Sequence, residues 1–270
     1  HGPLHLEAAH TRAADLATRG PLDFYIATSR ATEAIYRRLG IPAERMTMVY
    51  SGSHTDGYVR PRTNELRREL GLGDDTPLVG MIAWMYPPKA ILAQRSGLKG
   101  HDVFLRSIPL ILARHPDARF AIVGGELSGG ERYATRLRTM ASEMRLDDVL
   151  TFVGPRDDVP RIQPDFDVVV HPSRSENPGG AVYTLLGGIP TVGTRVGGIP
   201  EIVRDDETGL LVPPEDHESL AAAVDRMLAD PAWARATAAR GRELARSLFD
   251  ISVTAPRVAE FYDHVVRFGA

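Results

Sequence analysis

Short apolar runs alternate along this chain with longer segments of helical periodicity, and this alternation constrains the fold more than any other feature. The apolar runs are mostly continuous, as is typical of buried parallel strands, and span residues 24–27, 46–50, 78–83, 119–123, 149–153, 168–171, 191–193 and 210–212. The helical pattern predicts helices over residues 29–39, 101–114, 131–145, 180–187, 217–229 and 232–247. Together they predict an α/β fold with a doubly wound, Rossmann-like parallel sheet. Because such sheets bind ligands beyond the carboxyl ends of their strands, the chemistry is expected in the loops that follow.

Two segments interrupt the alternation. Residues 51–77 are polar and indicate an interdomain linker followed by a short helix. Residues 251–270 follow the last strand–helix unit and contain an aromatic-bearing helix with no later strand to join. We therefore expect three parts: residues 1–50 as the end of an N-terminal domain and the linker, 51–250 as the main domain, and 251–270 as a helix that folds back toward the N-terminal domain.

The composition excludes several classes of protein. A net charge of −3 and a pI of about 6.3 provide no positive field for a nucleic-acid backbone. The absence of cysteine excludes disulfides and thiolate metal sites, and the histidines show no metal-ligand spacing, so we expect no metal and no cofactor. No apolar run approaches the roughly 18 residues that span a bilayer. These features favour a cytoplasmic protein, with peripheral membrane attachment left open.

The loop HPSRSENPGG, residues 171–180, joins an expected strand to an expected helix. Free backbone amides at the helix start form an anion site, and glycines there let the backbone approach a ligand. The carboxylate of Glu176 can accept hydrogen bonds from neutral hydroxyls beside that anion. An anion attached to a polyol satisfies both groups; the alternative is a flexible glycine-rich turn with an exposed glutamate.

Lysine is rare in this chain, and both lysines lie in one segment. Lys89 and Lys99 are the two lysines among 32 basic residues. Lys99 stands directly before Gly100 and an expected helix start, so its ammonium can reach a phosphate oxygen held over the strand ends. Lys89 follows two prolines on a long loop, and Gly124, at the end of another strand, is expected to line the same crevice.

These segments together resemble the retaining glycosyltransferases of the GT-B fold, of the family 4 type. The resemblance runs through YIATSRATEAIYRRLGIP, VGMIAW, LKGHDVFL, ARFAIVGGE, VLTFVGPRDDV, DVVVHPSRSEN, GGIPTVGTRVGGIPEIV and DETGLLVPPED. It implies that residues 51–250 hold a nucleotide diphosphate sugar and that residues 1–50 are the remnant of an acceptor-side domain. The remainder of that domain is expected on a missing N-terminal segment or a partner chain, and the fragment alone is expected to be inactive if it needs that part.

The resemblance also assigns roles to single residues. Lys99 matches the lysine that neutralises the donor diphosphate, and Glu176 matches the first acid of a paired-glutamate motif that binds the donor sugar. His1 resembles a histidine that lies against this sugar, and Arg156 belongs to the loop beside the nucleobase. The backbone segment that faces sugar and phosphates comprises Asn177, Pro178, Gly179, Gly180 and Ala181.

Two positions depart from the family pattern. The second glutamate of the motif falls at Tyr183, or at Thr184 if the loop keeps its usual length. Trp84 occupies the position of a phosphate-binding arginine, and Arg95 or Lys89 on the adjacent loop is the expected replacement.

The resemblance implies a retaining hexosyltransferase that needs no metal. The expected donor is a nucleotide diphosphate sugar of the UDP or GDP type, and the expected acceptor is a carbohydrate, a lipid or a small molecule. Two alternatives stay open: a non-catalytic nucleotide-sugar-binding module, and a sugar-nucleotide epimerase of the same architecture.

Overall fold

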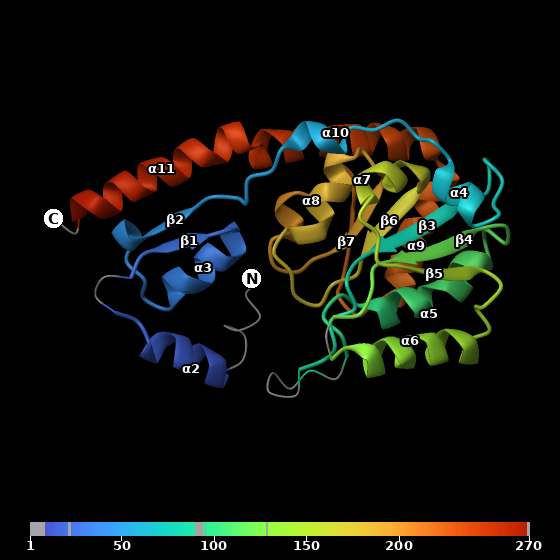
Figure 1. The fold of residues 1–270 in the computed structure, drawn as a ribbon, viewed down its shortest axis with the longest axis horizontal. Coiled ribbons are helices and arrows are strands. Elements are labelled where there is room, and N and C mark those ends of the chain that lie inside the picture. The colour runs from blue at the N-terminus through green and yellow to red at the C-terminus, as the bar shows by residue number, and fades with distance from the viewer. Residues whose placement is uncertain (1–8, 21–22, 90–93, 95, 128, 269–270) are drawn as a thin grey trace.

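The computed structural model describes residues 9–20, 23–89, 94, 96–127 and 129–268, and its largest part is a six-stranded parallel sheet (Figure 1). The strand order is β5-β4-β3-β6-β7-β8. The strands are β3 (Leu78–Ile82), β4 (Arg119–Val123), β5 (Leu150–Gly154), β6 (Val168–His171), β7 (Thr191–Thr194) and β8 (Leu210–Val212). The direction of winding reverses between β3 and β6, and the carboxyl ends of the strands at such a switch point frame the ligand site of doubly wound sheets.

Helices cover both faces of this sheet. They are α4 (Glu65–Glu69), α5 (His101–Leu112), α6 (Glu131–Glu143), α7 (Val159–Ile162), α8 (Gly179–Leu186), α9 (His217–Ala229) and α10 (Pro231–Phe249). Val168 and Val170 pack into a core that includes side chains of α5, α6 and α9, whereas Val169 packs into a core on the other face. This alternation is the period of two that a strand imposes, and because both faces are buried the strands read as continuous apolar runs.

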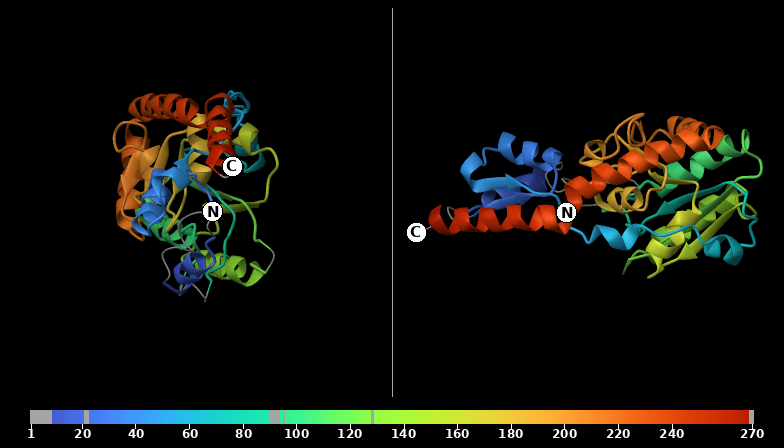
Figure 2. Two further views of the ribbon diagram at one scale, coloured as in Figure 1. Left: turned by 90° about the vertical axis from the view of Figure 1, so that its left-hand side faces the viewer. Right: turned by 90° about the horizontal axis from the view of Figure 1, so that it is seen from above.

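A smaller unit precedes the sheet. It contains α2 (Ala9–Ala17), β1 (Tyr25–Ala27), α3 (Arg30–Arg38) and β2 (Met46–Met48), with β1 and β2 paired in parallel. The C-terminal helix α11 (Ile251–Phe268) continues from α10 and runs along this unit (Figures 1 and 2). The ring of Phe24 lies edge-on to Phe261 and Phe268, with centroids 6.2 and 5.6 Å apart. The domain boundaries at residues 50 and 250 stay a prediction.

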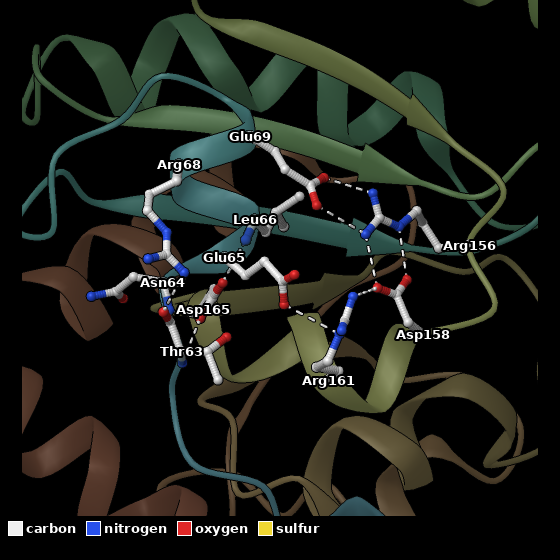
Figure 3. A network of polar contacts seen from close by, with 10 residues as sticks. All are labelled: Thr63, Asn64, Glu65, Leu66, Arg68, Glu69, Arg156, Asp158, Arg161 and Asp165. Atoms are coloured by element: carbon white, nitrogen blue, oxygen red, sulfur yellow. Dashed lines mark hydrogen bonds and ion pairs between the residues drawn. The ribbon is translucent and has the colours of Figure 1, made fainter.

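The linker between the two units is tied to the sheet domain by a buried carboxylate (Figure 3). Asp165 accepts hydrogen bonds from the backbone amides of Thr63 and Asn64 at 3.2 and 2.8 Å, and from that of Leu66 at 2.8 Å. These amides lie at the start of α4, where helix geometry leaves donors without intrahelical partners. Asp165 therefore caps α4 from a distant part of the chain.

The ends of the predicted strands and helices lie within two residues of the observed ones. The sequence pattern does not predict the helices α2 and α7, and none of the residues of α2 is buried. Over the described ranges, every helix is too short or too polar to cross a bilayer.

Candidate functional site

A cavity of about 480 Å³ opens at the switch point, between the carboxyl ends of β3 and β6. Its walls come from the loop after β3, the loop after β6, the first turns of α8, and α7, with Tyr58 added from the linker. The predicted site residues that line it are Trp84, Lys99, Glu176, Gly179, Gly180, Tyr183 and Thr184.

The ammonium of Lys99 and the carboxylate of Glu176 form an ion pair within this cavity. Their side chains are 17% and 15% exposed, so the pair is largely withdrawn from solvent yet still borders the cavity. The hydroxyl of Ser173 donates a second hydrogen bond to Glu176 at 3.2 Å. An anionic ligand can replace the carboxylate as the partner of the ammonium, and hydroxyl groups of the same ligand can then donate to Glu176.

The start of α8 faces the same space. Its N-cap residue is Pro178, which has no side-chain acceptor, so the first amides of the helix are free to bind a ligand. Gly179 has φ +42°, and a Cβ there would lie 2.7 Å from a carboxylate oxygen of Glu176. The glycine therefore lets the carboxylate approach the helix start.

Gly197 and Gly198, in the segment GGIPTVGTRVGGIPEIV, serve packing between two loops. A Cβ on Gly197 would lie 1.8 Å from the carbonyl oxygen of Glu176, and the amide of Gly198 donates to that oxygen at 3.0 Å. Two loops thus touch backbone to backbone, and this contact fixes the segment that carries Glu176.

Arg174 joins the loop of Glu176 to the loop of Lys99. Its backbone amide donates to the carbonyl of Leu98 at 2.9 Å, and its guanidinium donates to the carbonyl of Gly97 at 2.8 Å. The guanidinium also makes a bidentate contact with Asp102 in the first turn of α5, at 2.9 and 2.8 Å. Burial alone would raise the pKa of Asp102, but the bonds from Arg174 hold it below its ordinary value. The sequence offered no signal for this residue, because arginine is scattered over the whole chain.

Two histidines beneath the site are buried and neutral. Burial, with a smaller effect of the nearby Lys99 charge, lowers the pKa of His171 to about 3. Burial also lowers the pKa of His101 to about 4. A ring nitrogen of His171 lies 2.9 Å from the hydroxyl of Thr184, so this hydroxyl already has a hydrogen-bond partner at the floor of the cavity.

Aromatic side chains occupy the positions that depart from the family pattern. Tyr183 is 43% exposed and stacks on Tyr58 of the linker, with centroids 5.1 Å apart and planes at 25°. Trp84 is 46% exposed in the loop that follows β3. No sequence signal placed Tyr58 in the site, because a linker residue reaches it only through the fold.

Several predicted site residues lie outside the cavity lining. Arg156 forms ion pairs with Glu69 and Asp158, at 2.6 and 2.7 Å (Figure 3), and so holds the loop before α7 against α4. The side-chain oxygen of Gln94 accepts from the Lys89 amide at 2.9 Å. A Cβ on Gly124 would lie 2.1 Å from the carbonyl oxygen of Ala83, so this glycine serves strand packing.

The remaining predicted residues divide between the junction of the two units, the core and undescribed segments. The side chain of Asn177 hydrogen-bonds with Thr28, Ser29 and Thr32, so it binds the small unit. Ala181 is buried in the core around α8. Pro178 borders a second, adjacent cavity. His1 and Arg95 lie outside the described residues.

The sequence of this chain matches a known protein family and several characterised proteins. Residues 90–230 match the family model described as "Glycosyl transferases group 1". The GDP-mannose-dependent alpha-(1-6)-phosphatidylinositol monomannoside mannosyltransferase of Mycolicibacterium smegmatis is 30% identical over 244 residues, which cover 86% of this chain and 60% of that protein. A D-inositol 3-phosphate glycosyltransferase of Thermobifida fusca is 31% identical over 209 residues, covering 75% and 46%.

Solved structures agree on the fold. HepE of Anabaena in complex with UDP-glucose has a TM-score of 0.81 at 25% identity, covering 93% of this chain and 66% of that one. Sucrose-phosphate synthase of Thermosynechococcus elongatus has a TM-score of 0.79 at 27% identity, covering 98% and 66%. The chain spans 60% of the length of the first relative and 46% of the second.

Proposed function

Because the chain belongs to the family of glycosyl transferases group 1, we propose that it acts as a glycosyltransferase that moves a sugar from a nucleotide diphosphate sugar to an acceptor, with retention of the anomeric configuration. One observation carries the proposal: a cation, a carboxylate and the start of a helix meet in one cavity at the switch point of the sheet. An anion joined to a polyol is the ligand that uses all three.

The donor diphosphate lies, in this proposal, between the ammonium of Lys99 and the amides of Gly179 and Gly180. Binding transfers Lys99 from Glu176 to a phosphate oxygen, and Glu176 then accepts hydrogen bonds from hydroxyls of the donor sugar. As the bond between sugar and diphosphate breaks, negative charge grows on the leaving phosphate, where the ammonium and the helix amides stabilise it.

The names of the relatives support a donor of the GDP or UDP type. The mannosyltransferase of Mycolicibacterium smegmatis is GDP-mannose-dependent by name, and HepE was solved with UDP-glucose. We therefore infer a hexose donor, with a carbohydrate, a lipid or a small molecule as the acceptor. Residues 51–250 form the donor domain in this proposal, and residues 1–50 and 251–270 form the acceptor side.

A non-catalytic nucleotide-sugar-binding module is the second candidate. Tyr183 in place of a carboxylate and Trp84 in place of an arginine favour it, because both replacements remove polar contacts to a nucleotide. Incubation with a panel of UDP and GDP sugars, followed by product analysis, separates the candidates. Sugar transfer or donor hydrolysis supports the transferase, saturable binding without turnover supports the module, and conversion to an epimer refutes both.

A further inference from the structure

The start of helix α3 is attached to the loop that carries Glu176. The side-chain amide of Asn177, the next residue, donates to the hydroxyl of Thr28 at 2.8 Å. The hydroxyls of Ser29 and Thr32 each donate to the side-chain oxygen of Asn177 at 3.0 Å. Thr28 follows β1, Ser29 is the N-cap of α3, and Thr32 lies in its first turn. The neighbour of the Glu176 carboxylate is therefore anchored in the small unit.

Glu201 makes a second contact with the start of α3. Its carboxylate accepts from the backbone amides of Arg30 and Ala31, each at 3.0 Å, and from the hydroxyl of Tyr50 at 2.7 Å. The first amides of a helix have no intrahelical partners, and a negative charge is favourable beside them. Glu201 therefore fixes the start of α3 on the sheet domain by hydrogen bonds and by charge.

Gly198 connects both contacts to the backbone of Glu176. Its amide donates to the carbonyl oxygen of Glu176 at 3.0 Å, and its own carbonyl accepts from the amide of Glu201 at 3.1 Å. A Cβ on Gly198 would lie 2.5 Å from Cδ of Pro178 and 2.9 Å from Cβ of Ser29. The loop of Glu176, the loop after β7 and the N-cap of α3 thus meet without space between them, so a displacement of α3 would displace the backbone of Glu176.

These backbone anchors gain importance when the donor binds. In the free chain the carboxylate of Glu176 pairs with Lys99 and accepts a hydrogen bond from Ser173. In the proposed function Lys99 leaves this pair for a phosphate oxygen. The place of the carboxylate then depends more strongly on its backbone anchors, and a binding group must lie within about 0.5 Å of its productive position.

We propose that Asn177 and Glu201 are positioning residues, which dock the start of α3 on the loop of Glu176 and thereby set this carboxylate to bind the donor sugar. This inference rests on the proposed function. The described lining of the cavity at the switch point includes none of Asn177, Glu201 and Thr32. An effect of these residues on sugar binding must therefore pass through Glu176.

The test is calorimetric titration of UDP, UDP-glucose, GDP and GDP-mannose into the full chain and its variants. The quantity compared is the sugar ratio, the Kd of the bare nucleoside diphosphate divided by the Kd of its sugar-bearing form. Asn177→Ala and Glu201→Ala should each lower the sugar ratio at least fivefold, while the Kd of the bare nucleotide changes less than twofold. Thr32→Val, which removes one hydroxyl donor to Asn177, should lower the ratio at least twofold.

Glu33→Ala is the matched control, because Glu33 is a carboxylate in the first turn of α3 that pairs with Arg37 of the same helix at 2.7 Å. It should leave the sugar ratio unchanged. Two conservative variants guard against misfolding as an explanation. Glu201→Gln keeps one acceptor oxygen and Asn177→Asp keeps both acceptor positions, so each should have a sugar ratio at least twofold above that of the corresponding alanine variant.

A double variant separates positioning from a general structural role. In the Glu176→Ala background, Asn177→Ala should change the sugar ratio less than twofold, because the carboxylate that it positions is gone. Equal losses for bare and sugar-bearing nucleotides, an unchanged sugar ratio in Asn177→Ala and Glu201→Ala, or a further fall in the Glu176→Ala background would each overturn the inference. Absence of nucleoside diphosphate binding by the unaltered chain would instead refute the proposed function.

Discussion

Removal of the Lys99 ammonium tests whether this cation binds the donor diphosphate in the cavity at the switch point. A hydrogen bond to a charged group contributes about 1.5–3 kcal/mol, and each 1.4 kcal/mol is a factor of ten in affinity. Lys99→Ala should therefore weaken UDP or GDP binding by about 10- to 150-fold. We expect the upper part of this range, because Glu176 is only 15% exposed and would face the diphosphate without its cation.

A double variant separates the two contributions. Replacing Glu176 by Gln in the Lys99→Ala background removes the repulsion, so Lys99→Ala/Glu176→Gln should bind a bare nucleoside diphosphate more tightly than Lys99→Ala does. Coupling energies of about 0.5–3 kcal/mol are usual for residues in contact. Calorimetric titration of UDP and GDP into all variants measures these differences, and thermal unfolding verifies that each variant is folded.

Lys89→Ala is the matched control, because Lys89 is the other lysine of the chain and lies outside the cavity lining. It should change affinity less than twofold. Unchanged affinity in Lys99→Ala, or an equal loss in Lys89→Ala, would refute the placement of the diphosphate at Lys99.

Further predictions concern the residues around this pair. Arg174→Ala should lower the free energy of unfolding by about 3 kcal/mol, measured with urea, since it removes the bidentate partner of Asp102, a carboxylate only 9% exposed, and leaves Arg106 at 3.5 Å as its ion-pair partner; a loss below about 1 kcal/mol would contradict this. Tyr183→Glu should tighten nucleotide binding by about 1 kcal/mol, while loss of the stack on Tyr58 should cost about 0.5–1.5 kcal/mol of stability; weaker binding would show that the tyrosine is the better ribose partner. Stability should also fall on acidification, because His171 has a pKa of about 3 in the folded chain and an ordinary pKa of 6.5 in the unfolded chain: below pH 6.5 the unfolded chain takes up a proton that the folded chain does not. The contribution of this histidine is at most about 1.4 kcal/mol per pH unit between pH 6.5 and 3, and urea unfolding of His171→Gln between pH 7 and 5 should give a shallower slope than the unaltered chain.

The sequence predicted the sheet well because its strands are buried on both faces. β4, β6 and β8 have the predicted limits, since a buried strand shows as an uninterrupted apolar run. The sheet also explains why Lys99 and Glu176 lie close together, because both residues lie in loops that follow strands meeting at the switch point.

Residues that depend on contacts between loops could not be predicted in the same way. The ion pairs of Arg156 with Glu69 and Asp158 have no signal in the sequence, because the linker helix α4 reaches the loop of Arg156 only through the fold. The bridging role of Arg174 and the entry of Tyr58 into the cavity likewise arise from the spatial approach of distant segments. Local sequence patterns do not predict such contacts.

The position of a nucleoside diphosphate in crystals of the chain soaked with UDP or GDP tests the central claim most directly. The account predicts density for the diphosphate within hydrogen-bonding distance of the Lys99 ammonium and of the amides of Gly179 and Gly180, with the ion pair between Lys99 and Glu176 opened. A nucleotide bound at another edge of the sheet, or a bound nucleotide beside an intact ion pair, would contradict it.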